Sequence, residues 1–115
     1  MTTDAERAAY AAKHYASKEA DIEGKANTYA KEHGCWHVKF KSSNNRGVPD
    51  RIYITPDGAV FFIEFKKPSK RPAKAGRQQK LVIDEMRDNK AVVFVTNDLG
   101  EAKAIIYNMV KFGSP

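Results

Sequence analysis

The chain has 115 residues with a formal net charge of +6, and its 42% hydrophobic content is enough for one modest core. Its single cysteine, Cys35, excludes an internal disulfide framework and fits a reducing compartment. No apolar run approaches the roughly 18 residues that span a bilayer, and the N-terminus lacks a signal-peptide hydrophobic region. We therefore expect a cytoplasmic protein with no membrane partner, and the excess of cations favours a polyanionic partner such as nucleic acid.

The first part of the chain divides into an arm and a helix. Residues 1–20 are rich in alanine, and Asp4 to Ser17 is expected to form a helical arm outside the main domain, residues 21–115. A better helix is predicted from Asp21 to the break at Gly34. Its apolar stripe consists of Ile22, Ala26, Tyr29, Ala30 and His33. Glu23 lies beside this stripe, either as a surface glutamate that the helix dipole favours or as a contributor to a site at the edge of the core.

The segment from Cys35 to Lys41 alternates apolar and polar residues and predicts the first strand. His33, Cys35 and His37 could suggest zinc, but structural zinc takes four ligands and Gly34 interrupts any helical pairing. Packing against the sheet or along its edge is the better interpretation of Cys35 and His37.

The stretch from Gly47 to Lys66 is the centre of the pattern. Two apolar runs, Ile52 to Ile54 and Val60 to Phe65, flank the turn sequence Thr55-Pro56-Asp57-Gly58 and predict a hairpin. Side chains alternate along a strand, so Glu64 and Lys66 share one face, and Asp50 can lie across from Glu64. An isolated Glu-x-Lys triplet is usually a solvated ion pair. Here it ends a strand that is apolar on both faces, as a central strand is.

Cations gather on both sides of this hairpin. A polar loop, residues 42–47, leads to Asp50, and a loop with five cations in eleven residues, residues 67–77, follows Lys66. Both are either ordinary solvated loops or surfaces that follow a nucleic-acid backbone. The candidate nucleic-acid contacts are Arg46, Lys67, Lys70, Arg71, Lys74 and Arg77.

The remaining elements predict an α/β fold. A helix is expected from about Gly76 to Asn89, and its spacing turns Gln79 inward and Gln78 towards solvent. A buried strand from Ala91 to Val95 and a final helix follow, the latter capped by Asp98 and Glu101 and ended by Gly113. The order of helix, three strands, helix, strand and helix predicts a mixed four-stranded sheet flanked by helices.

The motif Gly47-Val48-Pro49-Asp50, followed by Glu64-Phe65-Lys66 and a glutamine opening a helix, resembles the PD-(D/E)XK nucleases. Within them the chain looks most like the virus-type replication-repair nuclease (VRR-NUC) domain, in its small standalone phage form. The resemblance covers about residues 21–110 and implies a restriction-endonuclease-like αβββαβα core. It also implies catalytic residues Glu23, Asp50, Glu64, Lys66 and Gln79, with Mg²⁺, or Mn²⁺ as a substitute, held by Asp50, Glu64, the Phe65 carbonyl and Glu23. Arg51 and the bulk of Phe65 depart from the family pattern without removing any of these groups.

The resemblance implies a Mg²⁺-dependent, structure-selective DNA endonuclease that acts on branched DNA such as Holliday junctions, in a bacterial or phage-infected cell. We expect a homodimer, because symmetric resolution of a junction needs two related cuts, and we expect no small-molecule substrate. Three alternatives are a flap or repair nuclease, a DNA-binding subunit without catalysis, and a sequence-specific endonuclease. The last is disfavoured because a chain of this length has little room for base-reading elements.

Overall fold

The computed structural model describes residues 3–6, 18–40 and 47–115. The elements are α2 (Lys18–Glu32), β1 (Trp36–Lys39), β2 (Arg51–Ile54), β3 (Val60–Phe65), α3 (Arg77–Asp88), β4 (Val93–Thr96) and α4 (Leu99–Phe112). This order confirms the predicted sequence of elements. Residues 4–6 are helical, but most of the expected arm, together with Arg46, lies outside the described residues.

The four strands form one mixed sheet in the order β1-β2-β3-β4. The β1–β2 and β2–β3 pairs are antiparallel and the β3–β4 pair is parallel, so the chain must cross over through α3 to reach β4. The predicted turn closes the β2–β3 hairpin: Gly58, at φ +89°, donates its N–H to the Thr55 carbonyl (2.9 Å). β3 is therefore a central strand, as its apolar residues on both faces predict.

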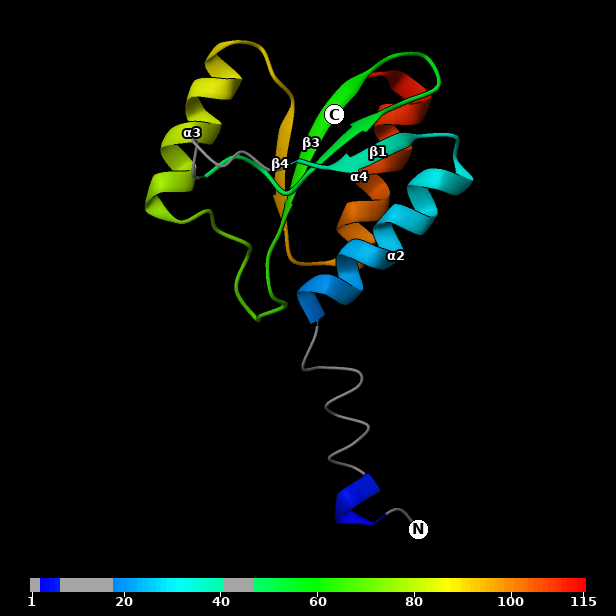
Figure 1. Cartoon of the computed structure of the whole chain (residues 1–115), viewed down its shortest axis with the longest axis vertical. Coiled ribbons are helices and arrows are strands. Elements are labelled where there is room, and N and C mark those ends of the chain that lie inside the picture. Colours follow the sequence, from blue (N-terminus) through cyan, green and yellow to red (C-terminus); the bar gives the residue numbers. More distant parts are fainter. Residues whose placement is uncertain (1–2, 7–17, 41–46) are drawn as a thin grey trace.

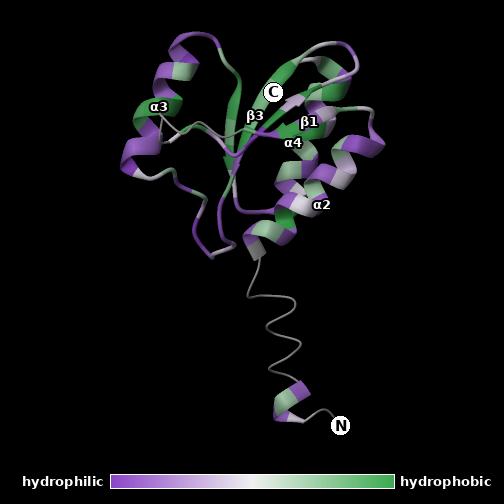
Figure 2. Ribbon diagram, in the orientation of Figure 1, coloured by the Kyte–Doolittle hydropathy of each residue, from purple (hydrophilic) through white to green (hydrophobic). Residues whose placement is uncertain are grey.

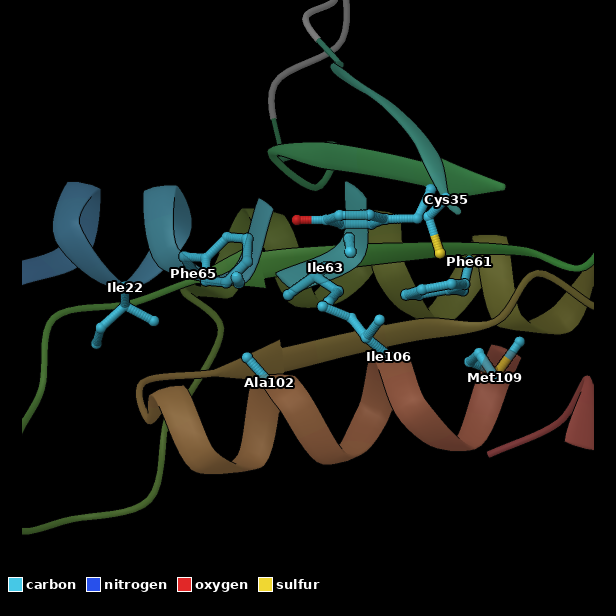
Figure 3. Close-up of a cluster of buried hydrophobic side chains, with 11 residues drawn as sticks. Ile22, Cys35, Phe61, Ile63, Phe65, Ala102, Ile106 and Met109 are labelled. Carbon is cyan, nitrogen blue, oxygen red and sulfur yellow. The ribbon is translucent and has the colours of Figure 1, made fainter. Parts of the chain in front are cut away.

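The main core lies between one face of the sheet and the helices α2 and α4 (Figure 1). Alternate residues of the two central strands are fully buried on this face, namely Tyr53, Phe61, Ile63 and Phe65. Figure 3 shows the three β3 residues of this set meeting Ile22 from α2 and Ala102, Ile106 and Met109 from α4. The ring of Tyr53 stacks on Phe61, with centroids 5.1 Å apart. This packing fixes the position and direction of β2 and β3, whose ends carry the candidate site.

The opposite face of the sheet is covered only in part. α3 lies over it on the β4 side, apart from α2 and α4 (Figure 1), and buries Ile83. An open groove of about 380 Å³ runs between α3 and the sheet, and its apolar lining includes Phe40, Phe62, Val82 and Met86. Towards β1 the apolar residues of this face are exposed, namely Trp36 (55%), Val38 (38%) and Phe40 (36%).

Several predicted boundaries differ from the structure: β1 ends at Lys39 rather than Lys41, β4 ends at Thr96 rather than Val95, and three elements begin elsewhere. α2 begins at Lys18 rather than Asp21, and Glu19 and Asp21 in its first turn suit the positive end of the helix dipole. β1 begins after Cys35, whose N–H donates to the Ala30 carbonyl in the closing turn of α2. β4 begins at Val93 rather than Ala91, because the N–H groups of Lys90 and Ala91 donate to carbonyls at the end of α3.

The two ends of α4 follow the prediction. Asp98 is its N-cap and accepts the Glu101 N–H (2.8 Å), and Gly113 closes it in the left-handed conformation. Among the described residues, no helix is both long and apolar enough to cross a membrane.

Candidate active site

The two central carboxylates lie across from each other at one end of the β2–β3 hairpin. The register pairs Arg51 with Ile63, which places Asp50 opposite Glu64. The Asp50 N–H donates to Glu64 Oε1 (3.0 Å), and the Phe65 N–H donates to Asp50 Oδ2 (3.3 Å). The backbone N–H of Asp50 therefore orients the Glu64 carboxylate, and the backbone N–H of Phe65 orients the Asp50 carboxylate. The buried Pro49 precedes the pair and restricts the backbone of Val48, which fixes the entry of the chain.

Lys66 completes this cluster on the same face as Glu64. Its Nζ lies 3.3 Å from Glu64 Oε2, and its side chain is 31% exposed whereas that of Glu64 is 7% exposed. Burial raises the pKa of Glu64 above its ordinary value, the nearby Asp50 raises it further, and hydrogen bonding from Gln79 and the charge of Lys66 oppose the rise. The site thus holds two carboxylates close together against an electrostatic cost, which a cation would remove.

Gln79 reaches the cluster from the first turn of α3. It points inward and Gln78 is exposed, as the helical spacing predicts. The Gln79 side chain hydrogen-bonds to Glu64, and its Oε1 is buried without a hydrogen-bond partner among the described residues. Gly47 allows this approach, because a Cβ on Gly47 would lie only 2.9 Å from Gln79 Cα. The loop before Asp50 and the start of α3 are therefore in backbone contact.

The structure does not bring Glu23 into this cluster. Glu23 Oε2 accepts a 2.8 Å hydrogen bond from Arg51 Nε, with both side chains largely buried. Arg51 Nη1 also lies 3.2 Å from His37 Nδ1, so Arg51 lies between α2 and β1. The sequence shows Arg51 only as a departure from the family pattern and does not predict this ion pair. Arg51 could be identified as a partner of Glu23 only once the helix and strand were known to pack together.

Among the described residues, no group of three or more His, Cys, Asp and Glu side chains is placed to hold a metal ion. The packing predicted for Cys35 agrees with the structure, and His33 has a local partner in its own helix. His33 Nδ1 is 2.8 Å from the Tyr29 carbonyl, and Cys35 is buried in the core, which raises its pKa.

The residues present nevertheless fit a hard divalent cation. Asp50 and Glu64 supply carboxylate oxygens, and the Gln79 Oε1 is a buried oxygen that has no donor among the described residues. Mg²⁺ takes few protein ligands, usually one or two carboxylates, and completes its coordination with water and substrate phosphate. A pair of carboxylates with a backbone carbonyl at Phe65 is therefore sufficient, without Glu23.

The basic loop that follows β3, residues 67–77, leaves the sheet directly after this cluster. All five of its candidate contacts are exposed: Lys67, Lys70, Arg71, Lys74 and Arg77. Figure 2 shows the loop as a largely hydrophilic stretch that leaves the end of β3. Asn97, just after β4, donates from Nδ2 to the Arg71 carbonyl (3.0 Å) and fastens the loop to the sheet. Asn97 is not among the residues predicted from the sequence, where its only signal is its position at the end of a buried strand.

Comparisons with known proteins support the fold that carries this site. No protein-family model matches the chain. A solved structure described as a VRR_NUC domain superposes with a TM-score of 0.70 at 24% identity, over 78% of this chain and 95% of its own. A curated protein, "Putative nuclease p44" of Acyrthosiphon pisum secondary endosymbiont phage 1, is 47% identical over 34 residues, 30% of this chain. The match spans 37% of that relative's length. The chain therefore has the fold of a VRR_NUC domain, which confirms at the level of the fold the resemblance in its sequence.

Proposed function

We propose that the protein is a metal-dependent DNA endonuclease that hydrolyses phosphodiester bonds. The observation that carries the proposal is the cluster of Asp50, Glu64 and Lys66, in which two opposed carboxylates are oriented by backbone N–H groups beside an ammonium. The VRR_NUC fold and the name of the phage relative both support a nuclease. The cluster adds the chemical groups that such a reaction needs.

Mg²⁺, with Mn²⁺ as a substitute, would be held by Asp50, Glu64 and the Phe65 carbonyl, and when bound it polarises the phosphate and lowers the pKa of water. Lys66 is partly exposed at the rim, where its ammonium can orient the attacking water or stabilise charge that develops on the phosphoryl oxygens. Gln79 holds the Glu64 carboxylate in place by its hydrogen bond and offers one further oxygen. Glu23 can reach this site only by leaving Arg51.

For the substrate we propose branched DNA, such as a Holliday junction, cut by a homodimer in the cytoplasm of a bacterial or phage-infected cell. The exposed cations of the loop after β3 provide contacts to phosphates, which position DNA without reading its sequence. The described residues of one chain hold one cluster of this kind, so paired cuts would need two chains.

The decisive experiment incubates the purified protein with matched junction, flap, splayed and linear DNAs in Mg²⁺, Mn²⁺, Ca²⁺ or chelator. We expect cleavage of the junction in Mg²⁺ and Mn²⁺ and none in chelator, with Ca²⁺ permitting binding with little turnover. Preferential cutting of flaps would instead indicate a repair-type flap nuclease, and full activity in chelator would exclude the metal mechanism.

Single substitutions then test the cluster. Asp50→Asn, Glu64→Gln and Lys66→Met should each lower the cleavage rate by at least about 10²-fold while leaving DNA affinity within several-fold. Asp57→Asn is the matched control, because Asp57 is an exposed carboxylate in the turn of the same hairpin. If the cluster variants cut at the wild-type rate, the reaction takes place elsewhere; if the wild type binds DNA without cutting, the protein is a DNA-binding subunit.

A further inference from the structure

The outer edge of the sheet is open at β1. β1 is the last strand in the sheet, and among the described residues no strand pairs with its far side. The Phe40 N–H donates to the Asp50 carbonyl, so Phe40, and by alternation Val38 and Trp36, direct their backbone groups towards β2. The N–H and C=O groups of His37 and Lys39 therefore point outward. Such an edge is a template for another strand.

The side chains of this edge are apolar where an unpaired edge is normally protected by charge. Trp36, Val38 and Phe40 alternate along the strand, so they share the sheet face that α3 leaves uncovered, and they are 55%, 38% and 36% exposed. Neither proline nor glycine interrupts this segment. Lys39 is the one charged side chain between Trp36 and Phe40. The edge is thus suited to pairing with an uncharged, apolar strand.

We infer that β1 of a second copy of this chain pairs antiparallel with β1, with a two-fold axis between the two Val38 residues. This inference rests on the homodimer proposed above and names its interface. In this register His37 of one chain lies opposite Lys39 of the other, so the outward backbone groups of both strands are satisfied by four hydrogen bonds. Trp36 lies opposite Phe40 of the other chain, and Val38 opposite Val38. The edge is therefore complementary to itself, as an isologous interface requires.

The charges on the other face permit this pairing. His37 would meet Lys39 of the second copy, and burial, Arg51 and Lys31 all lower the pKa of His37, which favours its uncharged form beside the lysine. By contrast, a nucleic-acid strand on this edge would find Lys39 as the one cation of the strand, whereas the loop after β3 is rich in cations. A second copy is the better occupant.

The area of this patch sets the strength of the dimer. A whole aromatic side chain offers about 150 to 250 Å², so the exposed parts of Trp36 and Phe40 amount to roughly 200 Å² per protomer. Two such patches fall short of the roughly 1,200 Å² that a stable complex buries. We expect a weak dimer, held mainly by the strand pairing and strengthened when both subunits bind one DNA molecule.

The pairing also arranges the two catalytic clusters. With strands about 4.8 Å apart and a rise of about 3.4 Å per residue, the two Asp50 Cα atoms would lie roughly 20 Å apart. Because the two-fold axis is perpendicular to the sheet, both clusters face the same side, where a single branched DNA can contact both.

Cysteine cross-linking tests this register directly. The two Val38 residues form a non-hydrogen-bonded antiparallel pair, whose Cα atoms lie about 4.5 Å apart, within the range of a disulfide. Val38→Cys should give a disulfide-linked dimer under mild oxidation at least ten-fold faster than Val60→Cys, the matched control. Val60 is 43% exposed on β3, away from the edge, and the native Cys35 is buried. Equal rates for the two variants, or no dimer with Val38→Cys, would overturn the proposed interface.

A second variant keeps the test independent of the disulfide. Val38→Asp places like charges directly opposite each other and should raise the dimer dissociation constant at least ten-fold in sedimentation, whereas Val60→Asp should not. Val38→Asp should still nick one strand of a junction but lose paired cuts. If Val38→Asp lost DNA affinity but kept the wild-type mass in sedimentation, Val38 would be a DNA contact and the proposed dimer interface would be wrong.

Failure of the interface and failure of the nuclease proposal can be told apart. If the wild type cuts no DNA but the Val38→Cys variant still forms the disulfide-linked dimer, the nuclease proposal fails and the interface stands. If the wild type cuts DNA as a monomer, the interface fails alone.

Discussion

The contact between the loop at Gly47 and the start of α3 can be tested with two glycines of the β2–β3 region. Gly47 has φ +96° and Gly58 has φ +89°, so alanine is strained by a similar amount at both, about 1 to 2 kcal/mol. Only at Gly47 does the added Cβ meet other atoms, 2.9 Å from Gln79 Cα and 3.1 Å from both the Gln78 carbonyl and Val82 Cγ2. At Gly58 nothing lies within 4 Å.

Because the atom nearest to the added methyl is backbone, α3 itself must move. Overpacking of this kind costs about 1 to 3 kcal/mol, so Gly47→Ala should be less stable than Gly58→Ala by that amount. The difference should lower the Tm of Gly47→Ala by at least about 4 °C relative to Gly58→Ala. Urea denaturation and thermal melts of both variants, in chelator, measure it.

The same displacement of α3 should also lower the rate of DNA cleavage. Gln79 hydrogen-bonds to Glu64, and a misplacement near 1 Å can cost about 10²-fold in rate. Gly47→Ala should therefore cut junction DNA far more slowly than Gly58→Ala, at a temperature where both are folded. Equal stability of the two variants would refute the close contact, and wild-type cleavage by Gly47→Ala would refute its role in placing Gln79.

The charges of the chain give three further predictions. Neutralising Lys70, Arg71 and Lys74 together should weaken DNA binding and reduce the slope of log binding constant against log salt concentration by about three. Neutralising the exposed Lys25, Lys31 and Lys103 should change this slope by less than about one. Fluorescence anisotropy at several salt concentrations measures both. The lowered pKa of His37 means that the unfolded chain protonates first as pH falls below the ordinary value of 6.5, so acid should destabilise the wild type more than His37→Asn in melts between about pH 7 and 5. If Glu23 acts through its 2.8 Å contact with Arg51, Glu23→Gln should lower stability yet retain most of the cleavage rate in saturating Mg²⁺, and a rate as low as that of Glu64→Gln would instead make Glu23 a metal ligand.

Local chemistry explains which parts of the fold the sequence can predict. The bounds of β3 and its turn agree with the prediction, because a run of apolar residues and a Pro-Asp-Gly turn leave one register. The caps of α4 agree for the same reason, since Asp98 and Gly113 act on their own helix ends. The predicted start of β4 is wrong because the Ala91 N–H hydrogen-bonds to a carbonyl at the end of α3. An apolar pattern cannot show that the first residues of the run belong to the end of a helix.

In the candidate site too, local pairing can be predicted from the sequence and long-range packing cannot. Asp50, Glu64 and Lys66 belong to one hairpin, so the pairing of two adjacent strands brings them together, and spacing alone predicts it. Glu23 belongs to α2, which lies on the face of the sheet opposite to Glu64. The direction of the Glu23 side chain depends on which other side chains lie between α2 and β2. Arg51, one residue after Asp50, points to that face and takes Glu23 as its partner. A long guanidinium beside a largely buried carboxylate lowers the cost of burying both, so the ion pair competes directly with any cation for Glu23. Arg51, one of the two residues at which the sequence departs from the family pattern, thus holds Glu23 away from the cluster of Asp50 and Glu64.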